Sequence, residues 1–311
     1  MKINKNQMLL FITTALMFAC LKTGEPRFLN GQCVEEARYS TVDTSNLEAV
    51  FIFMRHGVRA PWTTYPLDPN SNTTRWPNGR SQLTPFGIEQ AKIIGQILKE
   101  RYGNFTSQIK RNQIFIRASS AQRCIDTANI VKEELWKETT ALNEPFIYSL
   151  PKKIDSLLWE EPECPGADEE EEKNIKTSAV STFEAQPEIV KLYRFISNKT
   201  GLPPSMSGVD KAFDCVRCER INGYSNPDWA TDDIYEQMGN VYTKHLNFLY
   251  SSVRSRRMRV GPMLQEVIDH VKNFQKTSQS NRDNIKRFYL YTTVRIIQIF
   301  NSFFFFFLSF F

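Results

Sequence analysis

The sequence predicts an α/β fold: a parallel-type sheet with helices on both faces, in three layers, and a smaller, mostly helical subdomain. Residues 49–54 form a continuous apolar run of strand-forming residues, typical of a strand buried on both faces. A helical pattern, a second apolar run at 113–116 and another helical pattern follow in turn. This strand–helix order indicates a parallel sheet covered by helices.

Local signals place the elements of this first region. Thr84 and Pro85 are typical of an N-cap and a first helical residue, and Gly103 is a suitable stop for that helix. A second helix follows Ser119-Ser120, and a third core strand is predicted at 287–291. The residues on the buried face of the second helix are Ala121, Cys124, Ala128, Val131 and Leu135.

The domain prediction divides the chain into a core and a subdomain. Residues 48–142 and 256–293 form the α/β core, and residues 143–255 form the helical subdomain, with helices near 187–196 and 232–250.

The helical subdomain and the segment that follows it contain two charged runs and a Gly-Pro pair. The acidic run 168–172 and the basic run 254–259 are interpreted as solvated loops. A further helix is expected to begin at Gly261-Pro262.

The composition is that of a globular protein. Of 311 residues, 41% are hydrophobic and 23% are charged, which excludes collagen, a long disordered chain and a multi-span membrane protein. The net charge of +5 is small, so we expect no nucleic-acid partner. The last twelve residues differ from the rest because eight of them are Phe.

The N-terminus has the pattern of an export signal. Lys2 and Lys5 precede an apolar run at 8–19 that is too short to span a bilayer. Residues 1–20 are therefore predicted to be a signal peptide, which leads to secretion or to the lysosome. A buried core helix and a bacterial lipoprotein signal ending at Cys20 are the alternatives.

Other features agree with export. Asn72, Asn104 and Asn198 each begin an Asn-x-Thr triplet and are candidate glycosylation sites. The six cysteines lack metal-ligand spacing, so no metal site is expected and disulfides are the default interpretation.

The chemistry is concentrated where the first strand ends, in Arg55-His56-Gly57-Val58-Arg59-Ala60-Pro61. Ligands of open α/β sheets bind at the carboxyl ends of strands. A neutral imidazole, His56, can attack phosphorus, while Arg55 and Arg59 can hold phosphate oxygens. Gly57 allows close approach of the backbone. Arg117, at the end of the second strand, would complete the clamp.

This motif resembles the signature of the histidine acid phosphatases, the group that includes prostatic and lysosomal acid phosphatases. The similarity covers about residues 48–293. It continues through Thr64-Tyr65-Pro66-x-Asp68-Pro69, Trp76-Pro77-x-Gly79, Gln82-Leu83-Thr84, Arg101-Tyr102, Ile114-x-Ile116-Arg117-x-Ser119, Gln122-Arg123, Trp229-Ala230-Thr231 and Gly261-Pro262-Met263-Leu264 to His270.

The resemblance implies the histidine phosphatase fold and an acid phosphatase without metal or organic cofactor. His56 would be the nucleophile that becomes phosphohistidine, and Arg55, Arg59 and Arg117 would bind phosphate. The partners implied are small phosphate monoesters, with a homodimer as an assembly seen in the family.

The resemblance also bears on the cysteines. It implies that Cys164 and Cys218 form disulfides with cysteines that follow residue 293 in the family.

The chain departs from the family pattern after the third strand. The family has a His-Asp pair there, which protonates the leaving alcohol and contacts phosphate, whereas this chain has Val294-Arg295. The other histidines are His245 and His270; Asp269-His270 has the reverse order and lies in the preceding helix. Val58 replaces an Asp of many members at a variable position of the motif.

Codons for Val-Arg can form a splice donor, so we hypothesise that residues 294–311 are translated from a retained intron. A genuine variant C-terminus and a membrane anchor are the alternatives. The corresponding functional alternative is a catalytically inactive phosphate-ester binder, and a phytase-like or phosphoinositide phosphatase is a third hypothesis.

Overall fold

The computed structural model describes residues 28–29, 32–33, 44, 47–71, 73–137, 144–158 and 163–294. The predicted signal peptide and the tail after Val294 lie outside these residues. The chain divides into two compact units. The first comprises residues 1–57, 88–162 and 262–311, and the second comprises residues 58–87 and 163–261.

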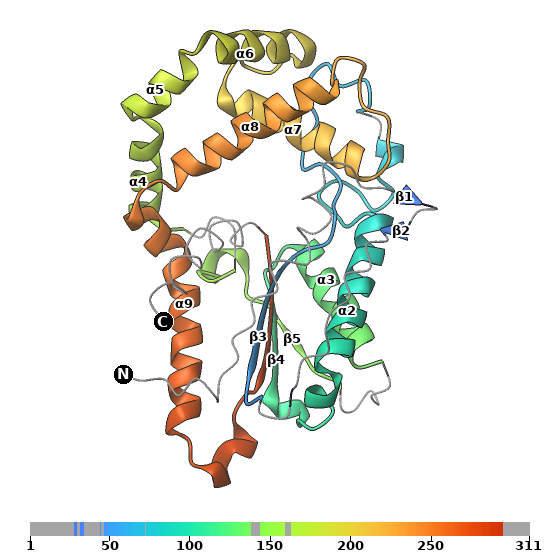
Figure 1. Ribbon diagram of the computed structural model, residues 1–311, viewed down its shortest axis with the longest axis vertical. Helices are drawn as coiled ribbons and strands as arrows, with labels where there is room; N and C mark the ends of the chain where they lie inside the picture. Colours follow the sequence, from blue (N-terminus) through green and yellow to red (C-terminus); the bar gives the residue numbers. More distant parts are fainter. Residues whose placement is uncertain are drawn as a thin grey trace. The chain divides into compact units, whose positions relative to one another are not determined.

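A four-stranded parallel sheet forms the centre of the first unit (Figure 1). Its strand order is β3-β6-β4-β5, so the last strand in sequence lies between the first two. The strands are β3 (Val50–Arg55), β4 (Ile114–Ala118), β5 (Ile147–Tyr148) and β6 (Phe288–Thr293). Two further short strands, β1 (Phe28–Leu29) and β2 (Gln32–Cys33), pair antiparallel with each other.

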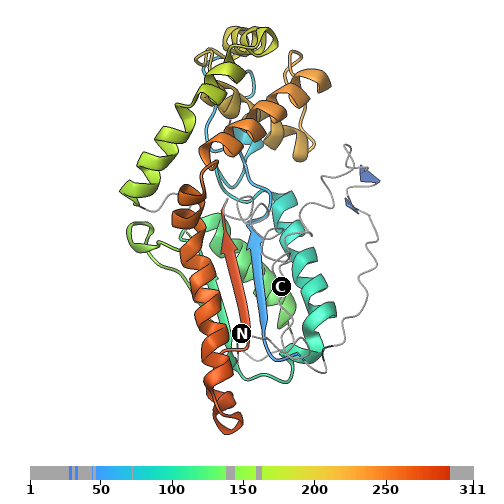
Figure 2. The same cartoon turned by 60° about the vertical axis from the view of Figure 1, so that its left-hand side comes forward.

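Helices cover both faces of this sheet, which confirms the three-layer α/β prediction. Helices α2 (Pro85–Thr106) and α3 (Gln122–Leu135) lie on one face, and α9 (Val253–Lys276) lies on the other (Figures 1 and 2). The α2/α3 face is largely aliphatic and buries Ile52 and Leu290. The α9 face is aromatic.

The register sets which strand ends meet. Arg55 lies opposite Thr293, and Arg117 lies opposite Tyr291. Because the strands are parallel, the carboxyl ends of β3, β6 and β4 share one edge of the sheet.

Helix α2 begins as predicted but ends later. The Thr84 hydroxyl accepts the N–H of Gly87 at 3.1 Å, which makes Thr84 the N-cap. Gly103, predicted as the stop, lies inside the helix, which continues to Thr106. Phe105 in the last turn is buried in the core, and this burial outweighs the low helix propensity of glycine.

The second unit is built from helices around its own apolar core. The helices are α4 (Pro165–Ile175), α5 (Ser178–Glu184), α6 (Pro187–Thr200), α7 (Met206–Ile221) and α8 (Asp232–Leu249). The predicted helices near 187–196 and 232–250 correspond to α6 and α8.

Short 3₁₀ helices occur in both units. The second unit contains η1 (Thr73–Arg75), and the first contains η2 (Arg111–Gln113), η4 (Lys152–Ile154) and η5 (Gln279–Asn284).

The unit boundaries differ from the predicted domain limits. Residues 58–87 belong to the helical unit, because Tyr65 packs into its core and Trp76 packs edge-on against Tyr224 at 5.1 Å. These contacts are distant in sequence, which is why the local patterns could not indicate them. Among the described residues, no helix is both long enough and apolar enough to cross a membrane.

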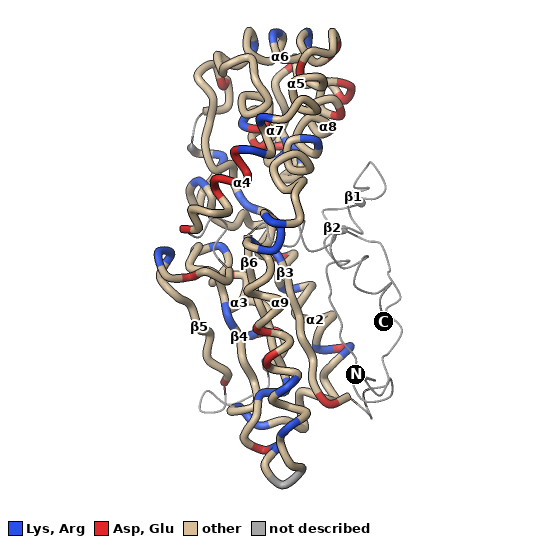
Figure 3. The backbone as a smooth tube through the Cα atoms, turned by 90° about the vertical axis from the view of Figure 1, so that its left-hand side faces the viewer, with Lys and Arg blue, Asp and Glu red and all other residues tan. Residues whose placement is uncertain are grey.

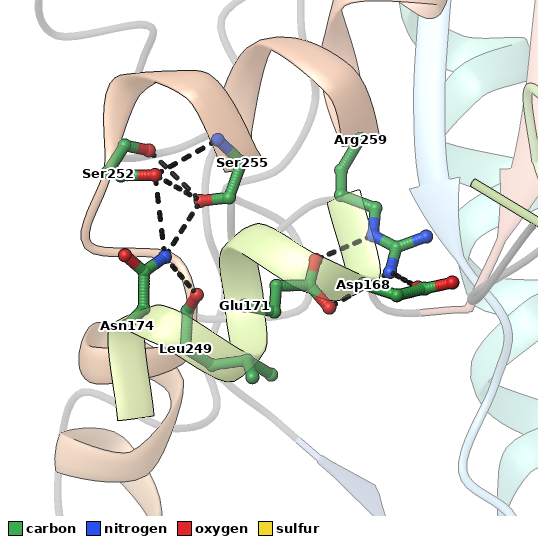
Figure 4. Close-up of polar contacts among 7 residues, drawn as sticks. All are labelled: Asp168, Glu171, Asn174, Leu249, Ser252, Ser255 and Arg259. Carbon is green, nitrogen blue, oxygen red and sulfur yellow. Dashed lines mark hydrogen bonds and ion pairs between the residues drawn. The ribbon is translucent and has the colours of Figure 1, made fainter. Parts of the chain in front are cut away.

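The two charged runs are helical, which corrects their interpretation as loops. The acidic run lies in α4 (Figure 3). Arg259, of the basic run, is only 5% exposed and forms ion pairs with Asp168 at 2.5 Å and Glu171 at 2.6 Å (Figure 4). The paired carboxylates offset the cost of burying this guanidinium.

Helix α9 also begins earlier than predicted. It starts at Val253, so Pro262 lies inside the helix rather than at its first turn. The Ser252 hydroxyl accepts the N–H of Ser255 at 3.1 Å, as an N-cap does. The Asn174 amide of α4 donates to both Ser252 and Ser255, which ties this helix start to α4 (Figure 4).

We predict that Glu171→Gln lowers the free energy of unfolding by about 1–3 kcal/mol, because Arg259 remains buried with one carboxylate fewer. The matched control is Glu172→Gln, the adjacent change in the same helix, which removes only an exposed pair with Lys176. Urea unfolding midpoints of the two variants test this. Equal midpoints would contradict the assignment of a structural role to the Arg259 pair.

Candidate active site

His56 follows the last residue of β3 and is 3% exposed. Its Nδ1 lies 2.7 Å from the carbonyl oxygen of Gly57. Because a carbonyl oxygen only accepts, Nδ1 carries the proton in this contact. The neutral ring then has its lone pair on Nε2, the nitrogen suited to attack.

Backbone contacts hold this loop at the sheet edge. The N–H of His56 donates to the Thr293 carbonyl at 3.2 Å, which extends the pairing of β3 with β6 beyond the strand. The N–H of Gly57 donates to the Thr127 hydroxyl of α3 at 3.0 Å. That hydroxyl donates in turn to the carbonyl of Arg123 at 2.7 Å, so its direction is set. The loop is therefore anchored from β6 and from α3.

The first unit brings Arg55, His56 and Arg117 to the same sheet edge. The guanidinium of Arg117 forms an ion pair with Asp155 at 2.8 Å and a longer one with Glu266 at 3.4 Å. Asp155 is fully buried. Neither carboxylate was identified from the sequence, because each is distant from Arg117 along the chain.

Glu266 contacts Arg117, His270 and Tyr291. Burial raises its pKa, but the neighbouring His270 ring, the hydrogen bond from Tyr291 and the charge of Arg117 outweigh burial and leave the pKa below its ordinary value. Burial and the Glu266 charge raise the pKa of Tyr291, so Tyr291 stays a hydrogen-bond donor.

Arg59, the second arginine of the motif, lies in the second unit. Its guanidinium makes two contacts with Asp214 of α7, at 2.7 and 3.1 Å, and donates to the Ala60 carbonyl at 2.9 Å. Asp214 also accepts the N–H of Trp62 at 3.2 Å. A bidentate carboxylate thus fixes the plane of this guanidinium.

Gly87, in the first turn of α2, packs against the motif loop and was missed by the sequence analysis. A Cβ at this position would lie 1.9 Å from the carbonyl oxygen of Val58, so only glycine permits this approach. The N–H of Thr84 donates to the same Val58 carbonyl at 3.0 Å. The start of α2 therefore holds the backbone between His56 and Arg59. The sequence did contain a signal for this approach, namely a glycine in the first turn of a predicted helix.

The remaining histidines have other surroundings. The ring of His270 on α9 packs at a tilt against Tyr289, with ring centres 4.5 Å apart, and its Nε2 lies 3.8 Å from Glu266. His245 of α8 pairs with Asp210 of α7. Neither follows a core strand as His56 does.

The structure describes two of the three candidate glycosylation sites and both candidate disulfide cysteines. Asn104 and Asn198 are exposed in the last turns of α2 and α6, and Asn72 lies outside the described residues. Cys164 and Cys218 are thiols; the resemblance places their partners after residue 293, where this sequence has no cysteine, so these disulfides stay predictions. Within the described part of the chain, no group of three or more metal-ligating side chains is present.

Comparison with known proteins identifies the family. The model of the histidine phosphatase superfamily, branch 2, matches residues 46–306. The chain belongs to this family. The match runs past Thr293, where we expected the resemblance to end.

Curated relatives are identical to the chain at about a quarter of the aligned positions. "Putative acid phosphatase 5" of Caenorhabditis elegans is 28% identical over 80% of this chain and 59% of its own length. Human prostatic acid phosphatase is 26% identical over 75% and 63%. Lysosomal acid phosphatase of Xenopus laevis is 26% identical over 72% and 55%. The chain thus spans about three fifths of these relatives.

Solved structures share the fold. The Hafnia alvei phytase in complex with tartrate superposes with a TM-score of 0.61 at 15% identity, over 82% of this chain and 74% of that one. The Citrobacter braakii phytase gives 0.56 at 17% identity, with the same coverage. At this identity the likeness establishes the fold alone.

Val294 occupies the position where the resemblance places a histidine. It follows β6, is 3% exposed and packs in the apolar core of the first unit. Because β6 lies between β3 and β4, this position falls between the strand ends that carry His56 and Arg117.

We predict that Gly87→Ala destabilises the chain by about 1–3 kcal/mol, because the new methyl group overlaps the Val58 carbonyl. Gly103→Ala in the same helix is the matched control. Its Cβ would meet only the Lys99 side chain at 3.9 Å, and we expect it to stabilise the chain by about 0.4–1 kcal/mol. Urea unfolding of both variants tests this, and a Gly87→Ala variant as stable as the control would refute the close approach.

Proposed function

We propose that this chain is an exported acid phosphatase that hydrolyses phosphate monoesters through a phosphohistidine at His56. The observation that carries the proposal is the 2.7 Å contact of His56 Nδ1 with the Gly57 carbonyl, which directs the lone pair to Nε2 at the sheet edge shared with Arg55 and Arg117.

The reaction would take two steps. His56 Nε2 forms a bond to phosphorus while the bond from phosphorus to the ester oxygen breaks, and the departing oxygen takes its proton from solvent water. Water then attacks the phosphohistidine and releases inorganic phosphate. Arg55, Arg59 and Arg117 would neutralise the charge that develops on the phosphate oxygens, so we expect no metal or organic cofactor.

Export is supported by the signal-like N-terminus and by the exposure of Asn104 and Asn198. Secretion and lysosomal delivery both begin with such a signal. The names of the relatives agree with an acid phosphatase of one of these compartments. A homodimer stays a prediction from the family resemblance.

Val294 supports a second candidate, a phosphate-ester binder without turnover. An apolar side chain cannot donate a proton to a leaving alkoxide, and loss of general-acid catalysis typically costs about 10²–10⁴-fold in rate. The defect should depend on the leaving group, because a nitrophenolate departs without protonation whereas an alkoxide does not.

We predict that the chain, incubated with radiolabelled aryl phosphate, forms a phosphoenzyme that is stable to alkali and labile to acid, as expected for phosphohistidine. His56→Asn should abolish this label and slow phosphate release on the order of 10³-fold or more. His245→Asn is the matched control and should retain both. Labelling that persists in His56→Asn would place the nucleophile elsewhere.

We also predict that the pair Val294→His with Arg295→Asp raises the rate on an alkyl phosphate by about 10²–10⁴-fold and the rate on p-nitrophenyl phosphate by much less. Val294→Ser with Arg295→Asn is the control, since it adds polarity without a proton donor. Steady-state phosphate release is measured for the parent chain and both variants on each of the two substrates. An equal gain on both substrates would show that the proton donor is not what this chain lacks.

A further inference from the structure

Arg117 contacts two carboxylates of different character. Asp155 Oδ1 accepts from Arg117 Nη2 at 2.8 Å and also from the backbone N–H groups of Leu157 and Leu158, at 3.2 and 3.0 Å. With three donors on one oxygen and no exposure to solvent, Asp155 is fixed in place. It sets the direction of the Arg117 guanidinium.

Glu266 is the less constrained partner. Its side chain is 25% exposed, and its Oε2 lies 3.4 Å from Arg117 Nη1, a long contact for an ion pair. Its other oxygen accepts the Tyr291 hydroxyl at 2.8 Å. Glu266 can therefore move away from Arg117 into solvent and keep the Tyr291 hydrogen bond, whereas the N–H groups of Leu157 and Leu158 hold the buried Asp155 beside Arg117.

The charges around Arg117 oppose an incoming anion. One guanidinium faces two carboxylates, so the group of three carries a net negative charge when both acids are ionised. The other titratable groups near Glu266 are His270 on its own helix, Tyr289 and Tyr291 on β6 and, through Arg117, Asp155. Within this group of three, a phosphate is attracted by one charge and repelled by two, whereas Arg55 at the same sheet edge adds attraction.

We propose that Asp155 and Glu266 are positioning residues with opposite effects: Asp155 aims Arg117 at phosphate, whereas Glu266 competes with phosphate for Arg117 and makes phosphate binding acid-dependent. This inference rests on the proposed role of Arg117 in phosphate binding.

The sign of the pH effect follows from linkage. In the phosphate-free protein Glu266 is ionised, because its pKa lies below the ordinary value. Bound phosphate would place negative charge beside Glu266 and raise its pKa. Phosphate binding should then take up a proton at Glu266, so affinity rises as pH falls between the two pKa values.

Isothermal titration of the full chain with inorganic phosphate, in buffers of different ionisation enthalpy, tests the proposal. Glu266→Gln should bind phosphate roughly tenfold more tightly than the parent chain at neutral pH, because a like charge at this range shifts such equilibria by about 1–3 pKa units. The variant should also take up fewer protons than the parent when phosphate binds. The two phosphate affinities should become similar at acidic pH, where Glu266 of the parent is protonated. Asp155→Asn should bind more weakly at every pH.

Asp269→Asn is the matched control, because it removes the same charge from an exposed position of α9. It should bind as the parent does. Asp155→Asn is informative only if its thermal unfolding is near that of the parent; if it is not, Glu266→Gln alone decides.

Arg117→Gln separates failure of the inference from failure of the proposed function. If Arg117→Gln weakens phosphate binding but Glu266→Gln binds no more tightly than the parent or takes up as many protons, the inference is wrong and the phosphate site stands. If Arg117→Gln binds phosphate as the parent does, the proposed role of Arg117 is itself wrong.

Discussion

The pairing of β6 with both β3 and β4 is the constraint on which the site depends. All six residues of β6 are buried, so its backbone groups must be satisfied by the two neighbouring strands. The pairing continues past the strands, where the N–H of His56 donates to Thr293 and that of Ser119 donates to Thr292. A segment near residue 290 thereby positions a histidine near residue 56. Without β6, His56 and Arg117 would have no common edge.

Arg259 and Arg117 are both accompanied by carboxylates, but the two pairings differ in how firmly the carboxylates are held. Arg259 is enclosed by Asp168 and Glu171, which is a structural pairing that joins α4 to α9. Arg117 lies at the end of a strand, with one fixed and one weakly held carboxylate. Desolvation makes an unpartnered guanidinium costly in both places. The proposal that Arg117 binds a ligand and Arg259 does not rests on the place of Arg117 at the carboxyl-end edge of the sheet, not on pairing alone.

Local signals predicted the elements that are themselves local. The apolar run that became β3, the N-cap at Thr84 and the apolar face of α3 depend on residues within a few positions of one another. The predictions that were wrong depend on distant partners. Gly103 did not end α2 because Phe105 is buried, and the basic run was not a loop because Arg259 has acidic partners about ninety residues earlier.

The sequence by itself determined the chemistry: a histidine between two arginines after a buried strand, and Val294-Arg295 after another. Only the tertiary structure decided how these groups are held. The strand order placed Val294 between the ends of β3 and β4, the Val58 carbonyl required glycine at position 87, and Arg117 received Asp155 and Glu266. The physical reason is that the reactive residue types are neighbours in the sequence, whereas their orientation depends on hydrogen bonds and packing between segments that only folding brings together.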